Sequence, residues 1–284
     1  ALFELNSKED QISLSFKNTN NVNLRDIEGD GTFANPYTIS SMKALKDLAQ
    51  IVKESDRYIY VKLADNIDAT GEVFETISNG RHKFNGTFDG DNYYISGLSY
   101  ETDTNNISNY YGLFGYVDTM SVVRNLNVVA DFEICYGTKI QYTGVIAGYN
   151  KGYIKNCKVY GGISAKIENI ESANAQSTNT SFVGLIAGVN DGNRGIEECE
   201  TYATVVIKAI KSENLIDVSN IKIYAGLIVG VNQETATVNK CFVRNRSNGL
   251  LNAGMKYYNN ETLNDYFLVV QNIAGEGCEN QVGK

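Results

Sequence analysis

Residues that could carry catalysis are few in this sequence. It has a single histidine, His82, in the polar stretch "NGRHKFNG", and both Ser-His-Asp and Cys-His nucleophilic catalysis depend on a histidine held by fixed neighbours. Cleavage of a polysaccharide would need carboxylates, alone or with lysine and arginine, gathered in one groove, and no acidic cluster recurs along the chain. We therefore interpret His82 as a solvated loop residue and predict no catalytic residue and no enzyme activity.

Metal chemistry has two weak candidates. Asp30 in "GDGT" and Asp89 and Asp91 in "FDGDN" stand next to glycines, where carboxylates could hold calcium. Asp-Gly pairs are also common turn formers, and neither stretch has the full EF-hand spacing. The five cysteines include no CxxC pair, and His82 is the only histidine that could complete a zinc site. We predict turns at the aspartates, no metal and no cofactor.

Tyrosine is abundant, with 19 copies, and four of these residues form two pairs: Tyr93 with Tyr94 and Tyr110 with Tyr111. Such rings could stack on sugars, but tyrosine is also common in half-buried strands. Tyr93 and Tyr110 are kept as candidate ligand-binding residues.

The composition excludes several functions. The 284 residues carry a net charge of -8, which argues against nucleic acid as a partner because affinity for phosphates comes from lysine and arginine. Apolar runs such as "AGLIVGV" are shorter than the roughly 18 residues that a membrane span needs. No signal peptide is visible in "ALFELNSKED", so we expect a cytosolic protein or one whose leader has been removed, and we favour the second.

Internal repetition is the strongest signal. The words "GLFGYV", "GVIAGYN", "GLIAGVN" and "GLIVGVN" are each followed by an apolar residue, two polar residues, and Leu or Cys. Aligned by this pattern, the copies are Ile95 with Leu98, Val123 with Leu126, Ile154 with Cys157, Ile196 with Cys199, and Val238 with Cys241, and a fainter copy is Tyr60 with Leu63. The irregular spacing of the copies predicts insertions in loops between fixed structural repeats.

The repeats predict an all-β fold, a right-handed parallel β-helix of about six rungs. Residues after Cys199 alternate as in a strand with one buried face, and stacked strands can share one core. We expect one inward column made of Leu98, Leu126, Cys157, Cys199 and Cys241. The cysteines in it should remain thiols. Neighbouring rungs hold Cβ atoms about 4.8 Å apart, whereas a disulfide prefers a Cβ–Cβ distance of about 3.8 Å. Asn150, Asn190 and Asn232 should form a side-chain amide ladder at a turn.

The ends of the stack need covers. Ser40 or Ser41 can cap a helix whose apolar residues, from Met42 to Val52, fall on one face. We predict one continuous structural domain with an N-terminal segment and capping helix at 1–55, the β-helix at 56–249 and a C-terminal cap at 250–284.

Two long inserts follow the cysteine strands, in "KIENIESANAQSTNTSF" and "KAIKSENLIDVSNIKIY". Both leave the same point of successive rungs, so we expect them to protrude side by side on one flank. Their candidate ligand-binding residues are Asn169, Glu171, Asn174, Glu213, Asn214 and Asp217. The alternative is that they are solvated loops of variable length without a ligand.

The glycine words with the strand that follows them resemble the GLUG-motif repeat, and "GDGTFANPYTIS" with "FNGTFDGDNYYISGL" is similar to the start of bacterial β-helical surface proteins that carry it. The resemblance covers about residues 28 to 248. It implies an exported adhesion protein on the bacterial cell surface, with a lipid anchor as its only attachment to the membrane. It supplies no catalytic residues. The long segments between rungs depart from the family pattern.

The sequence therefore favours a non-enzymatic, extracellular recognition protein. Its expected partners are a glycan or a protein on a host or neighbouring cell surface, bound through loops on one flank. The alternative is a polysaccharide-degrading lyase or hydrolase on the same fold, because fold alone does not decide function.

Overall fold

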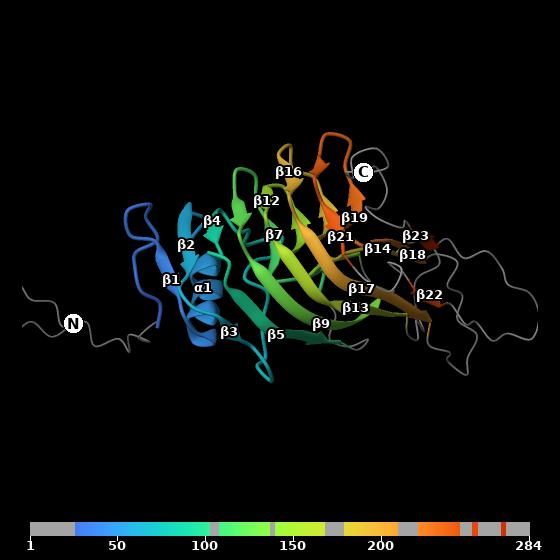
Figure 1. Ribbon diagram of the computed structural model, residues 1–284, viewed down its shortest axis with the longest axis horizontal. Helices are drawn as coiled ribbons and strands as arrows, with labels where there is room; N and C mark the ends of the chain where they lie inside the picture. The colour runs from blue at the N-terminus through green and yellow to red at the C-terminus, as the bar shows by residue number, and fades with distance from the viewer. Residues whose placement is uncertain are drawn as a thin grey trace, which may run out of the picture.

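The computed structural model describes residues 26–102, 108–136, 140–167, 179–209 and 221–244, together with the short strands at 252–254 and 268–270. These residues form one helix and four sheets, and the paired strands within each sheet run parallel. Figure 1 shows the strands of the sheets following one another along the long axis of the molecule, from the helix at one end towards the last strands at the other. The predicted all-β class with parallel sheets is confirmed.

The two largest sheets, A and B, each have seven strands among the described residues. Sheet A contains β1 (Tyr37–Ile39), β2 (Ile59–Leu63), β4 (Gly86–Asp89), β8 (Val122–Arg124), β12 (Tyr153–Lys155), β16 (Gly195–Glu197) and β20 (Val238–Asn239). Sheet B contains β3 (Ile67–Asp68), β5 (Tyr94–Glu101), β9 (Asn127–Tyr136), β13 (Lys158–Ile167), β17 (Glu200–Ala209) and β21 (Phe242–Val243), with β22 (Asn252–Gly254) also paired to β17.

Of the smaller sheets, D contains the strands that lead into the glycine words, and C contains strands formed by the second half of each word. Sheet C contains β7 (Phe114–Val117), β11 (Ala147–Asn150), β15 (Ala187–Asn190) and β19 (Val229–Asn232). Sheet D contains β6 (Tyr110–Tyr111), β10 (Gln141–Gly144), β14 (Asn179–Gly184), β18 (Ile221–Gly226) and β23 (Leu268–Val270). From β8 onward the chain visits the sheets in the order A, B, D, C, and each such pass, here called a coil, pairs with the next one.

The core is the shared interior of these coils. In sheet A the paired residues Val123, Ile154, Ile196 and Val238 are all fully buried. In sheet B the predicted alternation is confirmed, because Thr201, Ala203, Val205 and Ile207 of β17 are buried and the residues between them face outward. Each coil thus pairs with its neighbours along the edges of its strands and buries one face of those strands in the shared interior.

The glycine words form the corner between sheets D and C, where backbones from neighbouring coils meet. A Cβ atom on Gly148 would lie 2.6 Å from the carbonyl oxygen of Tyr142 and 2.8 Å from that of Gly115. Only glycine fits at such a close approach. The apolar residues inside the word, such as Val145 and Ile146, are fully buried.

At the corner between sheets A and B, each of four successive coils has a residue with left-handed backbone conformation followed by a buried residue. Asn125, Asn156, Glu198 and Lys240 have φ values between 50° and 54°. The residues that follow them are Leu126, Cys157, Cys199 and Cys241, and all four are buried. The three cysteines are free thiols, as is Cys135, and burial raises the pKa of the Cys199 thiol well above its usual value. Cys278 lies outside the described residues.

The sequence alignment of the earliest copies was wrong in register. Phe88, rather than Ile95, pairs with Val123, and Val61, rather than Tyr60, pairs with Phe88. Leu98 is buried but pairs with Ala130 after a bulge, so it does not share the column of Leu126 and the cysteines. The cause is the turn at 90–93, which lengthens the connection between β4 and β5.

The corner between sheets C and A contains the predicted asparagine ladder. Asn150 donates from Nδ2 to Oδ1 of Asn190 at 2.8 Å, and Asn190 donates to Oδ1 of Asn232 at 2.7 Å. All three side chains are buried, so the ladder pairs amide groups that would otherwise be unsatisfied in the interior.

One helix, α1 (Met42–Glu54), covers the N-terminal end of the stack (Figure 1). Ser41 caps it by accepting a hydrogen bond from the Ala44 amide at 3.1 Å, which settles the choice between Ser40 and Ser41. Its buried residues are Ala44, Leu45, Leu48, Ala49, Ile51 and Val52. No helix in the described part of the chain is long and apolar enough to cross a membrane. Most of the expected C-terminal cap at 250–284 lies outside the described residues.

Candidate functional site

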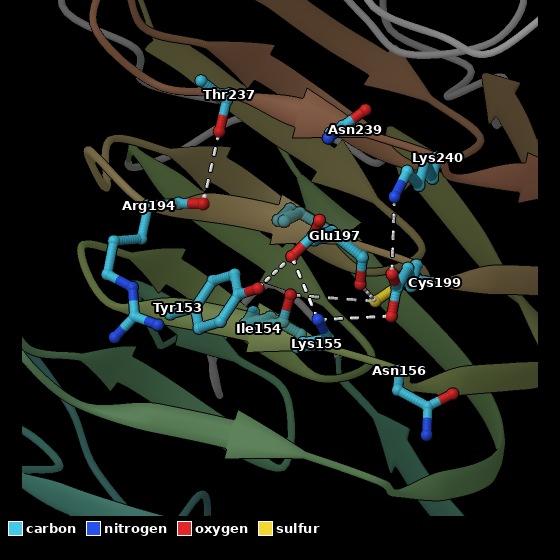
Figure 2. A network of polar contacts seen from close by, with 12 residues as sticks. Tyr153, Ile154, Lys155, Asn156, Arg194, Glu197, Cys199, Thr237, Asn239 and Lys240 are labelled. Atoms are coloured by element: carbon cyan, nitrogen blue, oxygen red, sulfur yellow. Dashed lines mark hydrogen bonds and ion pairs between the residues drawn. The ribbon is translucent and has the colours of Figure 1, made fainter.

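Charged side chains form a network on the outer face of sheet A (Figure 2). Lys155 lies 3.3 Å from carboxylate oxygens of both Glu197 and Glu198. Tyr153 donates a hydrogen bond to Glu197, and the guanidinium of Arg194 lies 4.2 Å from the centre of the Tyr153 ring. The network therefore links the neighbouring strands β12 and β16.

The pKa values of Lys155 and Glu197 are shifted further away from pH 7. Hydrogen bonds to Glu197 and Glu198 raise the pKa of Lys155, and hydrogen bonds from Tyr153 and Lys155 lower the pKa of Glu197. An acid and base that exchange protons during catalysis need pKa values near the working pH. We therefore interpret the network as a set of ion pairs that ties two coils together.

A groove of about 270 Å³ lies on the outer face of sheet B. It crosses the long strands β9, β13 and β17, which Figure 1 shows side by side in the middle of the molecule. Two outward rows of paired residues line it. They are Asp131, Gly162 and Thr204 in the first row, and Glu133, Ser164 and Val206 in the second.

Gly162, the middle residue of the first row, has no side chain to fill the groove. Its neighbours in the row, Asp131 on β9 and Thr204 on β17, both carry side chains. Because strands lie about 4.8 Å apart, the missing side chain leaves a notch between those two residues. We call this space, bordered by Asp131, Gly162 and Thr204, the Gly162 notch.

The groove is lined by carboxylate and hydroxyl groups. Among the described residues, none makes a hydrogen bond or ion pair with the Asp131 carboxylate, which is exposed. Glu133 is paired with Lys166. The Ser164 hydroxyl oxygen is buried and has no hydrogen-bond partner in the described structure. Acceptors and hydroxyl groups of this kind suit a ligand rich in hydrogen-bond donors.

Tyrosines border the groove one row nearer to the start of the strands. Tyr160 on β13 and Tyr202 on β17 are stacked, with ring centres 4.8 Å apart and planes 10° from parallel. Tyr202 is 37% exposed, while burial and contact with Tyr94 raise the pKa of Tyr160 to about 12. An exposed aromatic ring beside carboxylates and hydroxyls is a surface on which a sugar ring can stack.

The predicted ligand-binding residues of the inserts, Asn169, Glu171, Asn174, Glu213, Asn214 and Asp217, lie outside the described residues. The strands that flank the inserts are described, and both inserts connect sheet B to sheet D. One joins β13 to β14 and the other joins β17 to β18, and these strands pair in register. The groove lies on the same strands, within a few residues of the points where the inserts begin.

The two candidate tyrosines are not brought together. Tyr93 packs against the hydrophobic core. Tyr110 belongs to a ladder on sheet D in which Tyr110, Tyr142, Phe182 and Tyr224 stack at 5.2 to 5.6 Å. Tyr142 therefore covers one face of the Tyr110 ring, which leaves less of that ring for a sugar.

The other chemical candidates have structural roles. Asp30 and Asp89 each accept a hydrogen bond from the amide two residues later, as in aspartate turns. Asp89 also accepts hydrogen bonds from Arg124 and Asn125. His82 lies in a turn, where its amide donates to Asn79. Within the described ranges, no group of three or more histidine, cysteine or acidic residues is placed to hold a metal ion.

Sequence reasoning missed the groove. Its residues lie in "ADFEICY", "YGGISAK" and "YATVVIK", and the only local signal is the Gly-Gly pair inside a strand. A glycine in a strand interior often marks a close approach of a ligand or another backbone.

Comparisons with known proteins give partial matches, and no family model matches the chain. A protein named "Putative Gly-rich membrane protein" from Evansella cellulosilytica is 31% identical over 135 residues, 46% of this chain and 15% of that protein. "Halomucin" from Haloquadratum walsbyi is 34% identical over 149 residues, 47% of this chain and 2% of that protein. The chain therefore spans only a small part of either relative.

One solved structure also aligns with the chain. It is described as the crystal structure of a "putative immunoglobulin A1 protease" from Bacteroides ovatus. The alignment covers 87% of this chain and 86% of that one, with a TM-score of 0.44 and 18% sequence identity.

Proposed function

We propose that the chain is a recognition module of an extracellular bacterial surface protein, and that it binds a saccharide in the groove on sheet B. The observation that carries the proposal is the groove, which is lined by the Asp131 carboxylate and by hydroxyl groups and lies one row of residues away from the exposed Tyr202. A small number of polar groups converging beside an aromatic surface is typical of a site for a small ligand or a glycan.

The proposal includes the finer architecture. The order in which the chain visits sheets A, B, D and C fits a parallel β-helix, and connections between parallel strands are right-handed in about 98% of cases. A rigid stack of this kind would present the groove and the two inserts on one flank. The resemblance to GLUG-motif surface proteins agrees with this arrangement.

The surface location is supported by the names of the relatives. One of them is named as a membrane protein and another as a halomucin, and each shares a segment of about half of this chain. We propose that the present chain is exported and that it adheres to a glycan on a host or neighbouring cell.

A polysaccharide-cleaving enzyme is the second candidate, because the groove contains two carboxylates, of which Glu133 is paired with Lys166. Asp131 and Glu133 lie two residues apart on one strand, so both carboxylates rise from the same wall. A glycosidase needs its carboxylates on either side of the bond that is cleaved. The arrangement therefore favours binding over cleavage.

The test is binding of the purified chain to a panel of glycans and matrix proteins. The groove variant Asp131→Asn with Thr204→Val should lose saccharide binding, whereas Glu234→Gln, an exposed carboxylate change in the turn after β19, should keep it. Binding that survives in the groove variant would exclude this site. Release of reducing ends or unsaturated sugars by the wild-type chain would favour the enzyme instead.

A further inference from the structure

Two consecutive glycines on β13 differ in what the backbone demands of them. Gly161 has a φ of +95°, and a Cβ atom there would lie 2.1 Å from the carbonyl oxygen of Ala130. The fold therefore requires glycine at 161. Gly162 lies outside the left-handed region, and a Cβ atom on it would contact the carbonyl oxygen and hydroxyl of Thr204 at 3.0 and 3.1 Å. A side chain at 162 would therefore require Thr204 to move by a few tenths of an ångström.

Glycine inside a strand is unfavourable when the backbone does not need it, because it loses more conformational entropy on folding and offers no side chain to pack. At position 162 the visible consequence of glycine is the notch between Asp131 and Thr204. The geometry thus separates a glycine that builds the fold from one that shapes the outer surface.

We propose that the Gly162 notch receives a hydroxyl-bearing or amino-bearing group of a non-acidic saccharide, and that the site rejects acidic polysaccharides. This inference rests on the proposed function, that the groove binds a saccharide. The notch lies where Gly162 has no side chain; Asp131 borders it on one side, and on the other the Thr204 hydroxyl is 3.1 Å from the position that a Cβ atom of residue 162 would take. A sugar hydroxyl or ammonium group can donate to the carboxylate and fill the space.

The charges around the notch decide between saccharide classes. Asp131 has no cationic partner in the described structure, and the lysine nearby, Lys166, already pairs with Glu133. Glu101 on β5 pairs in register with Glu133 and adds a further negative charge beside the groove. A uronic acid or sulfate group would therefore meet the Asp131 carboxylate, which has no cationic partner in the described structure, and such a like-charge contact disfavours binding strongly.

The experiment compares three oligosaccharide classes of matched length: neutral glucans, amino-sugar oligomers and oligogalacturonates. Each is titrated calorimetrically against the wild-type chain, Gly162→Ala, Gly162→Thr and Asp131→Asn. The wild type should bind a neutral or amino-bearing oligomer and not the oligogalacturonate. Binding should weaken only slightly in Gly162→Ala and by about tenfold or more in Gly162→Thr, a loss comparable to that of a hydrogen bond to a charged group.

Thermal melts distinguish a filled notch from a damaged fold. Both Gly162 variants should unfold in a single cooperative transition like the wild type, because the backbone at 162 lies outside the left-handed region. Asp131→Asn should bind the non-acidic oligomer about tenfold more weakly. Unchanged affinity in a folded Gly162→Thr variant, or a wild-type preference for oligogalacturonate, would overturn the inference while leaving the proposed function standing. Absence of binding to all three classes and to a wider glycan panel would overturn both.

Discussion

The asparagine ladder offers a sharp test of the stacked architecture, through the substitution Asn190→Ala. Asn190 accepts a hydrogen bond from Asn150 at 2.8 Å and donates to Asn232 at 2.7 Å and to the Thr237 carbonyl at 3.1 Å. It is fully buried. Alanine would remove all three bonds and leave the Asn232 side-chain oxygen without its donor from the ladder.

The expected loss follows from those contacts. Each lost hydrogen bond removes a net stabilisation of about 1 kcal/mol, and a buried acceptor left unpaired costs about 1 to 3 kcal/mol more. The Thr237 carbonyl keeps its hydrogen bond from the Ile196 amide and is therefore not left unpaired. We expect the free energy of unfolding to fall by roughly 3 to 5 kcal/mol in Asn190→Ala. For a chain of this size the melting temperature should fall by about 10 °C.

The assay is chemical and thermal unfolding of the wild type, Asn190→Ala and a control, Asn239→Ala. Asn239 is exposed on β20 in sheet A, so its change should stay within about 0.5 kcal/mol. If Asn190→Ala unfolds with the same midpoint as Asn239→Ala, the buried ladder does not stabilise the stack and the reasoning is refuted.

Three further predictions concern stability. Thr201→Val should raise the free energy of unfolding by about 1 kcal/mol, because the Thr201 hydroxyl is buried without a partner in the described structure and its neighbour in the next coil is Val159; a lower midpoint in urea would contradict this. Cys199→Asp should lower it by roughly 3 kcal/mol or more, because the side chain is buried, and an unchanged midpoint would argue against an inward column. Burial raises the pKa of Tyr116 and Tyr160 to about 12 from 10.0, so the folded chain keeps protons that the unfolded chain loses above pH 10. Melting temperature should hold below pH 10 and fall as the pH rises towards 12, and melts that stay constant over that interval would contradict the assignment.

The parts of the fold that repeat could be predicted from the sequence. The residues of a coil that face inward are set by local alternation, and each coil packs against a copy of the same pattern. This is why the buried positions of β17 and the ladder of Asn150, Asn190 and Asn232 were predicted correctly. The amphipathic helix and its cap at Ser41 follow from equally local rules.

The register of the early coils could not be read in the same way. The stretch from Ile95 to Tyr100 imitates the repeat because the bulge at 96–97 turns Leu98 inward, although Ile95 pairs with Val128. An apolar spacing shows which residues are buried, but it does not show which residue of the next coil lies opposite. Pairing across coils depends on the lengths of the turns between the strands.

The groove depends on that pairing. Asp131, Gly162 and Thr204 are about thirty to forty residues apart in sequence, and they meet only because β9, β13 and β17 pair in register. The two inserts could be recognised from the spacing of the repeats in the sequence. The groove beside them could be found only once the pairing of β9, β13 and β17 was known.

The measurement that tests the proposed site most directly is a titration of the isotope-labelled chain with a non-acidic oligosaccharide, followed by backbone amide chemical shifts. Saccharide binding in the groove predicts the largest shifts at Gly161, Gly162, Ser164 and Thr204, with the amides of the sheet D ladder around Tyr142 unaffected. Chemical-shift changes concentrated at Tyr110 and Tyr142 would contradict the assignment of the site to sheet B. Changes spread over many residues while the Gly162 amide stays unchanged would contradict it too.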